Sequence, residues 1–143
     1  MASRLFVRRR DGRIEVRLNE AGRVIAREAF AHVLAAEVDP EHDWHASLNA
    51  PINPVSDLDD PVATLSRQND VTSNVELAVA TLHEEFLNDA EAWAWLCTLQ
   101  VALRATITSK GILSADRLNE SDEATRGYIA NLQAFLFALA DVF

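Results

Sequence analysis

A segment near the middle of the chain carries both a helix start signal and a helix stop signal, and it restricts the fold more than any other part of the sequence. Asn88 and Glu91 stand three residues apart, as the two partners of a capping box do. Lys110 and Gly111 are typical of a helix end. The spacing predicts one helix over residues 89–110. Its apolar residues occupy more than one face, so we expect it to be the central helix of the protein.

Other segments also show apolar residues at helical spacing. Asn19 suits the N-cap position of a helix over residues 20–37. Two further helices are predicted over residues 73–87 and 121–141, and a short one over residues 61–67, where proline occupies the first helical position. The chain is therefore expected to be rich in helices.

The N-terminal residues instead alternate with a period of two. Two alternating runs, residues 4–9 and 13–18, flank Arg10-Asp11-Gly12, and Asp-Gly between such runs predicts a β-hairpin. We expect one apolar face that holds Leu5, Val7, Ile14, Val16 and Leu18. We expect an opposite, mostly cationic face that holds Phe6, Arg8, Arg13, Glu15 and Arg17. An isolated hairpin is marginal in water, so this one must pack on helices.

The predicted fold class is mainly α (α+β), with an N-terminal β-hairpin packed on a bundle of about four helices. A length of 143 residues fits a single domain. Its expected parts are a β-hairpin over residues 1–18, a helix over 19–38, an irregular acidic linker over 39–59 and a helical body over 60–143.

The composition favours a cytoplasmic protein without membrane contact. No apolar stretch approaches the roughly 18 residues of a membrane span, and the N-terminal residues lack the apolar core of a secretory signal. Cys97 is the only cysteine, so no intramolecular disulfide is possible. Burial in the central helix would make this thiol structural, whereas exposure would make it a candidate redox residue.

Positive charge is concentrated at the N-terminus. Eight arginines against three acidic residues give residues 1–27 a formal charge of +5, and the total of −9 leaves −14 for the rest of the chain. Because the guanidinium fork suits carboxylates and phosphates, the hairpin arginines are candidate partner-binding residues; a solvated tip whose charge keeps the protein soluble is the alternative. We select Arg8, Arg9, Arg10, Arg13 and Arg17.

The linker supplies the other candidates. Trp44 is a large aromatic residue in an acidic segment, where it either packs on the helices or anchors a partner. His42 and His45, with Asp39 and Asp43 nearby, are weak candidates for metal ligands, because imidazole and carboxylate suit several divalent ions. A polar linker without metal is the alternative, and we expect no cofactor.

These features favour a protein partner. The acidic body and a pI of about 4.8 argue against nucleic acid, although a regulator that binds DNA directly is a minor alternative. The same charge separation would also suit a homo-oligomer. The sequence has no glycine-rich phosphate loop and no nucleophile elbow, so we do not expect an enzyme. A metal-binding or cryptic enzyme that uses His42 and His45 is the main alternative.

Several short motifs are spread over nearly the whole chain: Asp11-Gly12, Asp60-Pro61-Val62, Ala90-Glu91-Ala92-Trp93-Ala94-Trp95-Leu96 with Leu99, Thr108-Ser109-Lys110-Gly111-Ile112 and Tyr128-Ile129-Ala130-Asn131-Leu132-Gln133. Together they resemble an actinobacterial domain-of-unknown-function family whose members are typically encoded beside the ClpS protease adaptor. The resemblance implies an intracellular, mostly helical protein that acts as an oxidative-stress transcription regulator, with partners in the transcription or proteolysis machinery. We therefore expect a protein-binding regulatory or adaptor factor. A disulfide switch within the chain would need two thiols and is not expected.

Overall fold

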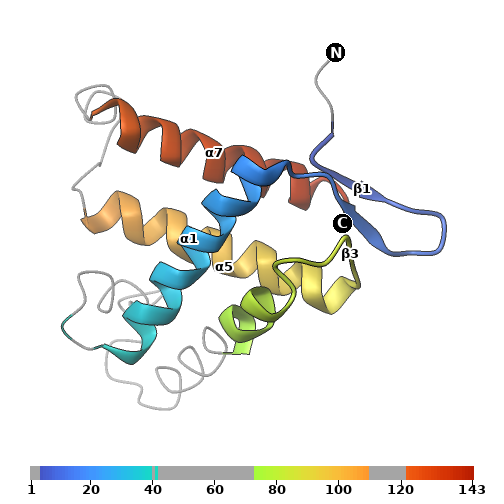
Figure 1. The fold of residues 1–143 in the computed structure, drawn as a ribbon, viewed down its shortest axis with the longest axis horizontal. Coiled ribbons are helices and arrows are strands. Elements are labelled where there is room, and N and C mark those ends of the chain that lie inside the picture. Colours follow the sequence, from blue (N-terminus) through green and yellow to red (C-terminus); the bar gives the residue numbers. More distant parts are fainter. Residues whose placement is uncertain (1–3, 40, 42–72, 110–121) are drawn as a thin grey trace, which may run out of the picture.

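A computed structural model describes residues 4–39, 41, 73–109 and 122–143 (Figure 1). Within these ranges the strands are β1 (Phe6–Arg8), β2 (Ile14–Val16) and β3 (Phe86–Leu87). The long helices are α1 (Glu20–Val38), α5 (Asp89–Ser109) and α7 (Glu123–Ala140), and residues 73–80 are also helical. The predicted fold class, mainly helical with an N-terminal hairpin, is confirmed.

The predicted helices begin with the capping hydrogen bonds expected from the sequence. Asn88 Oδ1 accepts from the backbone amide of Glu91 and Glu91 Oε1 accepts from that of Asn88, both at 2.8 Å, so the capping box is complete. Asn19 caps α1 by accepting from the amide of Gly22 at 2.8 Å. Asp122 caps α7 in the same way, through the amide of Thr125 at 2.7 Å. The expected helix end at Lys110 and Gly111 lies outside the described residues.

The prediction of one helix over residues 73–87 is wrong at its C-terminal end. The helix ends at residue 80, a turn follows at residues 81–83, and Phe86–Leu87 form β3. β3 pairs with β2 through Ile14 and Leu87, both fully buried. Pairing with a distant strand therefore overrides the helical spacing of the local sequence. The hairpin is part of a three-stranded antiparallel sheet with the order β1-β2-β3.

The predicted faces of β1 are also wrong. A two-residue turn at Asp11-Gly12 would have paired Val7 with Val16, but the structure pairs Phe6 with Val16. The loop contains three residues, because Arg9 donates its backbone amide to Arg13 at 2.7 Å. A shift of one residue exchanges the two faces of a strand. Phe6 is consequently buried in the core, whereas Val7 lies half-buried on the outer face.

Trp95 of α5 lies at the centre of the core. Its ring packs edge to face with Phe30 of α1, at 5.2 Å between centroids, and with Phe6 of β1, at 6.2 Å. Its indole nitrogen donates to the buried hydroxyl of Thr81 at 2.8 Å. Burial of each such large side chain contributes about 1.5–3 kcal/mol. The sheet, α1 and the turn before β3 are thus packed around one residue.

The helices leave the end of the hairpin free. α5 packs against both α1 and α7, and the loop between β1 and β2 projects beyond them at one end of the molecule (Figure 1). Arg23 of α1 fixes the approach to β3, because its Nη1 donates to the carbonyl oxygens of Leu82 at 2.8 Å and Glu84 at 3.3 Å. Among the described residues, no helix is both long enough and apolar enough to cross a membrane.

Candidate functional site

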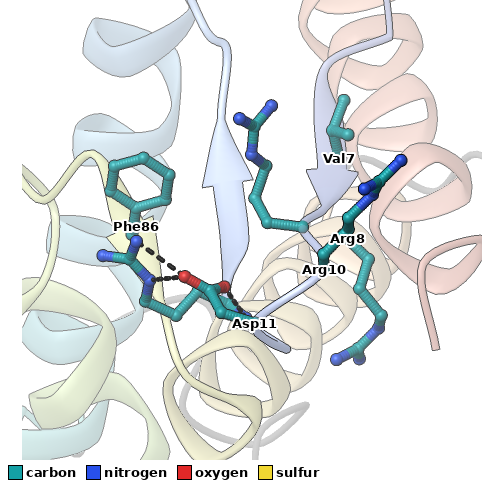
Figure 2. A pocket seen from close by; sticks show the side chains of 7 residues that line it. Val7, Arg8, Arg10, Asp11 and Phe86 are labelled. Carbon is teal, nitrogen blue, oxygen red and sulfur yellow. Dashed lines mark hydrogen bonds and ion pairs between the residues drawn. The ribbon is translucent and has the colours of Figure 1, made fainter.

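The projecting end of the sheet contains a shallow hollow of about 450 Å³ (Figure 2). Its lining comes from β1, the hairpin loop and β3, and comprises Val7, Arg8, Arg9, Arg10, Asp11, Arg13 and Phe86. In Figure 2, Phe86 lies on one side of Asp11, and Arg8 and Arg10 lie on the other. The structure thus brings four of the five predicted arginines to one place.

The loop is held by Asp11 and Gly12. Gly12 has a φ of +92°, a conformation that residues with a side chain rarely adopt. Asp11 Oδ1 accepts from the backbone amide of Arg13 at 3.0 Å, and Oδ2 accepts from its Nε at 2.8 Å. The backbone hydrogen bond from Arg13, followed by the one from its side chain, lowers the pKa of Asp11. The carboxylate is therefore held in its ionised form.

Arg13 is also stacked on an aromatic ring. Its guanidinium carbon lies 4.3 Å from the centroid of Phe86 on the neighbouring edge of the sheet. Such a cation–π contact contributes about 0.5–1 kcal/mol at an exposed site. Together with Asp11 it fixes the direction of the Arg13 guanidinium. Phe86 was not among the predicted site residues, since its position beside Arg13 depends on the pairing of β3 with β2.

Arg8 is occupied by contacts within the protein. Its guanidinium donates to the carbonyl oxygens of Val142 and Gly12, each at 2.8 Å, and to the carboxylate of Asp89 at 3.0 Å. These contacts join the hairpin to the C-terminal end of α7 and to the start of α5. We conclude that Arg8 has a structural role at the rim of the hollow.

Arg9 and Arg17 share a single carboxylate on the outer face of the sheet. Glu15 lies 3.3 Å from Nη1 of Arg9 and accepts from Nε of Arg17 at 2.7 Å. Only 19% of the Glu15 side chain is exposed, so the two pairs are partly shielded from water. Arg17 is not part of the hollow.

Arg10, at the tip of the loop, differs from its neighbours. It is exposed, and its guanidinium makes no hydrogen bond or ion pair with any residue in the part of the chain that the structure describes. The five hairpin arginines are met by three carboxylates, those of Asp89, Glu15 and Asp11. Among these hairpin residues, Arg17 included, two positive charges are left unbalanced. The lining of the hollow itself holds four arginines and one carboxylate, that of Asp11, so the hollow is cationic.

The remaining predicted site residues are elsewhere. Trp44, His42 and His45 lie outside the described residues. Cys97 is half-buried on α5 and forms no disulfide. Within residues 4–39, 41, 73–109 and 122–143, no three histidine, cysteine or acidic side chains come together as a metal site would require.

A second exposed feature adjoins Arg8. Trp93 of α5 and Phe143 pack edge to face at 6.0 Å, although 54% and 51% of these residues are exposed. The guanidinium carbon of Arg8 lies 6.0 Å from the centroid of Phe143. The apolar residues on several faces of α5 predicted a central, covered helix, but the described part of the protein leaves Trp93 open to solvent.

Comparisons of the chain with protein-family models, with curated proteins and with solved structures found no match. The functional interpretation therefore depends on the geometry of the site. That geometry combines unbalanced positive charge with apolar surface at one end of the molecule.

Proposed function

We propose that this protein is a cytoplasmic, non-enzymatic regulatory or adaptor factor that binds another protein through the cationic hollow. The observation that supports this proposal most directly is the state of Arg10, which is exposed beside three arginines that are already held by other residues. Arginine and aromatic side chains carry much of the binding energy at protein interfaces. The hollow offers both, because Phe86 forms part of its lining.

The overall charge supports a protein partner over nucleic acid. The chain has a formal net charge of −9, so positive potential is confined to a small region. Binding to a duplex uses several phosphate contacts along an extended surface. A small hollow lined by four arginines and one carboxylate is better suited to a local contact on a protein.

The regulatory part of the proposal is supported only by the family resemblance noted in the sequence, which suggests an oxidative-stress transcription regulator. The protein partner would then belong to the transcription or proteolysis machinery. A second copy of this acidic chain is the other protein that the hollow would suit, which would produce a homo-oligomer. Both alternatives use the same arginines.

The proposal can be tested by affinity capture from a lysate of the native host followed by mass spectrometry. The informative variant is Arg10→Glu, since Arg10 makes no hydrogen bond or ion pair with the described residues whose loss would unfold the protein. Arg8 is unsuitable, because its replacement would break three internal hydrogen bonds. Arg27→Glu is the matched control, an exposed arginine on α1 that is not part of the hollow.

We expect wild type and Arg27→Glu to capture the same protein and Arg10→Glu to lose it. Identical captures by all three proteins would contradict the proposal. A melting curve of each variant, measured by circular dichroism, verifies that the comparison is made between folded proteins.

A further inference from the structure

We infer that the ligand of the cationic hollow is a short acidic peptide segment, in which a carboxylate binds Arg10 and a neighbouring apolar side chain contacts Phe86. This inference rests on the proposed function and adds the chemistry of the partner. The hydrogen-bond donors around the hollow differ in how far they are already used by the protein.

The guanidinium of Arg10 has N–H donors that no described residue uses. A guanidinium has five N–H donors in a planar fork that matches the two oxygens of a carboxylate. None of these donors is used within the described part of the chain, whereas Arg8 has three of its hydrogen bonds satisfied internally. An incoming carboxylate at Arg10 therefore competes with no side chain or carbonyl group of the described residues.

Arg13 provides a second cation that is already oriented. Its Nε and Nη2 both lie 2.8 Å from Oδ2 of Asp11, and its plane is stacked on Phe86. A side chain that is ordered before binding loses less conformational entropy when a ligand arrives. Asp11 lies between Arg10 and Arg13 in the sequence and neutralises only one of the two charges.

The apolar part of the lining suggests more than a bare anion. Val7 and Phe86 are both half-buried and face the same hollow. Its volume of about 450 Å³ falls within the range of about 300–1,000 Å³ that is usual for ligand pockets. There is room for a few side chains, which favours a short segment that carries both acidic and apolar residues.

The size of the cationic region argues against a long polyanion. Outside the first 27 residues the formal charge is −14, so an extended anionic ligand would pass from the arginines onto an acidic surface. Repulsion between like charges would oppose that binding. A peptide of a few residues avoids this repulsion because it ends within the hollow.

The inference is tested by fluorescence anisotropy with a labelled six-residue peptide that alternates glutamate and leucine. The comparison ligands are the same peptide with glutamine in place of glutamate and a single-stranded DNA hexamer. The proteins are wild type, Arg10→Gln and the control Arg27→Gln. We expect the glutamate peptide to bind wild type and Arg27→Gln equally, and to bind Arg10→Gln about tenfold more weakly through loss of a charge-assisted contact.

Equal binding of the glutamate and glutamine peptides would overturn the inference, as would an unchanged affinity of Arg10→Gln. Binding of the DNA hexamer with the same dependence on Arg10 would show a general anion site instead. Sedimentation that reveals a dimer lost in Arg10→Gln would identify a second copy as the occupant and would also overturn it. If the glutamate peptide does not bind but capture from the lysate still depends on Arg10, the inference of an acidic peptide ligand is wrong and the proposed function stands.

Discussion

Nε of Arg8 donates a hydrogen bond to the carbonyl oxygen of Val142 at 2.8 Å, across 134 positions of the sequence. The same guanidinium contacts the carboxylate of Asp89 at the start of α5. One side chain therefore joins the hairpin to the beginning of one helix and to the residues after another. The orientation of the cationic hollow relative to the helices depends on this contact.

Replacement of Arg8 should consequently affect stability more than replacement of any other hairpin arginine. We expect Arg8→Ala to lower the free energy of unfolding by about 1–2 kcal/mol, since its hydrogen bonds are only partly shielded from water. Arg10→Ala removes the same charge without loss of a hydrogen bond or ion pair to any described residue, and it should change stability by less than about 0.5 kcal/mol. Denaturation in urea, followed by tryptophan fluorescence, measures both values. Equal losses would show that the Arg8 contacts contribute nothing specific.

Two buried threonines allow a test of the hydrogen bond in the core. Thr81 accepts from the indole of Trp95, whereas the buried hydroxyl of Thr98 has no hydrogen-bond partner among the described residues. Thr81→Val should cost about 1–3 kcal/mol, because it leaves a buried N–H unsatisfied.

Thr98→Val makes the identical change where no partner is lost, so we expect a neutral or stabilising effect. The midpoints of thermal unfolding distinguish the two variants. A Thr98→Val protein as unstable as Thr81→Val would show that the introduced methyl group, and not the lost hydrogen bond, is responsible.

Helix starts were predictable from the sequence because their causes are local. The capping partners Asn88 and Glu91 are three residues apart, and the N-cap Asn19 bonds to an amide three residues later. Such hydrogen bonds form within one turn of helix, so residue type and spacing are enough to place them. The predicted bounds of α1 and α5 agree closely with the structure over the described residues.

The sheet was less predictable. The loop could consist of two residues, Asp11-Gly12, or of three, Arg10-Asp11-Gly12, and the strand register differs by one residue between the two. Both loops are compatible with glycine at a positive φ. β3 contains only two residues, and their pairing with β2 is set by a contact more than 70 positions away. Local periodicity contains no signal for either outcome.

The candidate site was partly predictable for the same reason. The clustering of arginines at the hairpin tip follows directly from the sequence, and four of them line the hollow. The sequence does not show which of these arginines bind other residues of the protein. Arg8, for example, binds Asp89 and Val142, which are distant from it in the sequence. Phe86 likewise reaches Arg13 only through the fold.

Two glycines should respond in opposite directions to substitution by alanine. A Cβ on Gly12 would meet no atom within 4 Å, but the φ of +92° disfavours any side chain. We therefore expect Gly12→Ala to cost about 1–2 kcal/mol. Gly127 lies on the exposed surface of α7 with equal space for a Cβ and no positive φ.

Gly127→Ala should therefore stabilise the protein by up to about 1 kcal/mol, the difference in helix propensity between the two residues. Urea denaturation of both variants tests the comparison. If Gly12→Ala were neutral, the loop would have to adopt a different conformation from the one described.

Tyr128 should make stability depend on pH in the alkaline range. Burial, assisted by the negative charge of Glu28, raises its pKa from 10.0 to about 12, although the neighbouring side chain of Thr106 opposes the shift. In the unfolded chain the phenol loses its proton near pH 10, while the folded protein retains it. Between these two values the unfolded state binds fewer protons, so the free energy of unfolding falls as the pH rises. Below pH 10 both states are protonated and Tyr128 contributes no pH dependence.

The measurement compares wild type with Tyr128→Phe in urea denaturation at several pH values between 9 and 12. Other alkaline groups are common to both proteins, so the difference between the two curves isolates the phenol. Above pH 10, we expect the free energy of unfolding of wild type to fall relative to that of Tyr128→Phe. Because the chain has a single tyrosine, the near-ultraviolet absorbance of the phenolate gives its pKa directly. A titration midpoint near 10 in the folded protein would mean that the hydroxyl is exposed to water, and the two stability curves should then remain parallel.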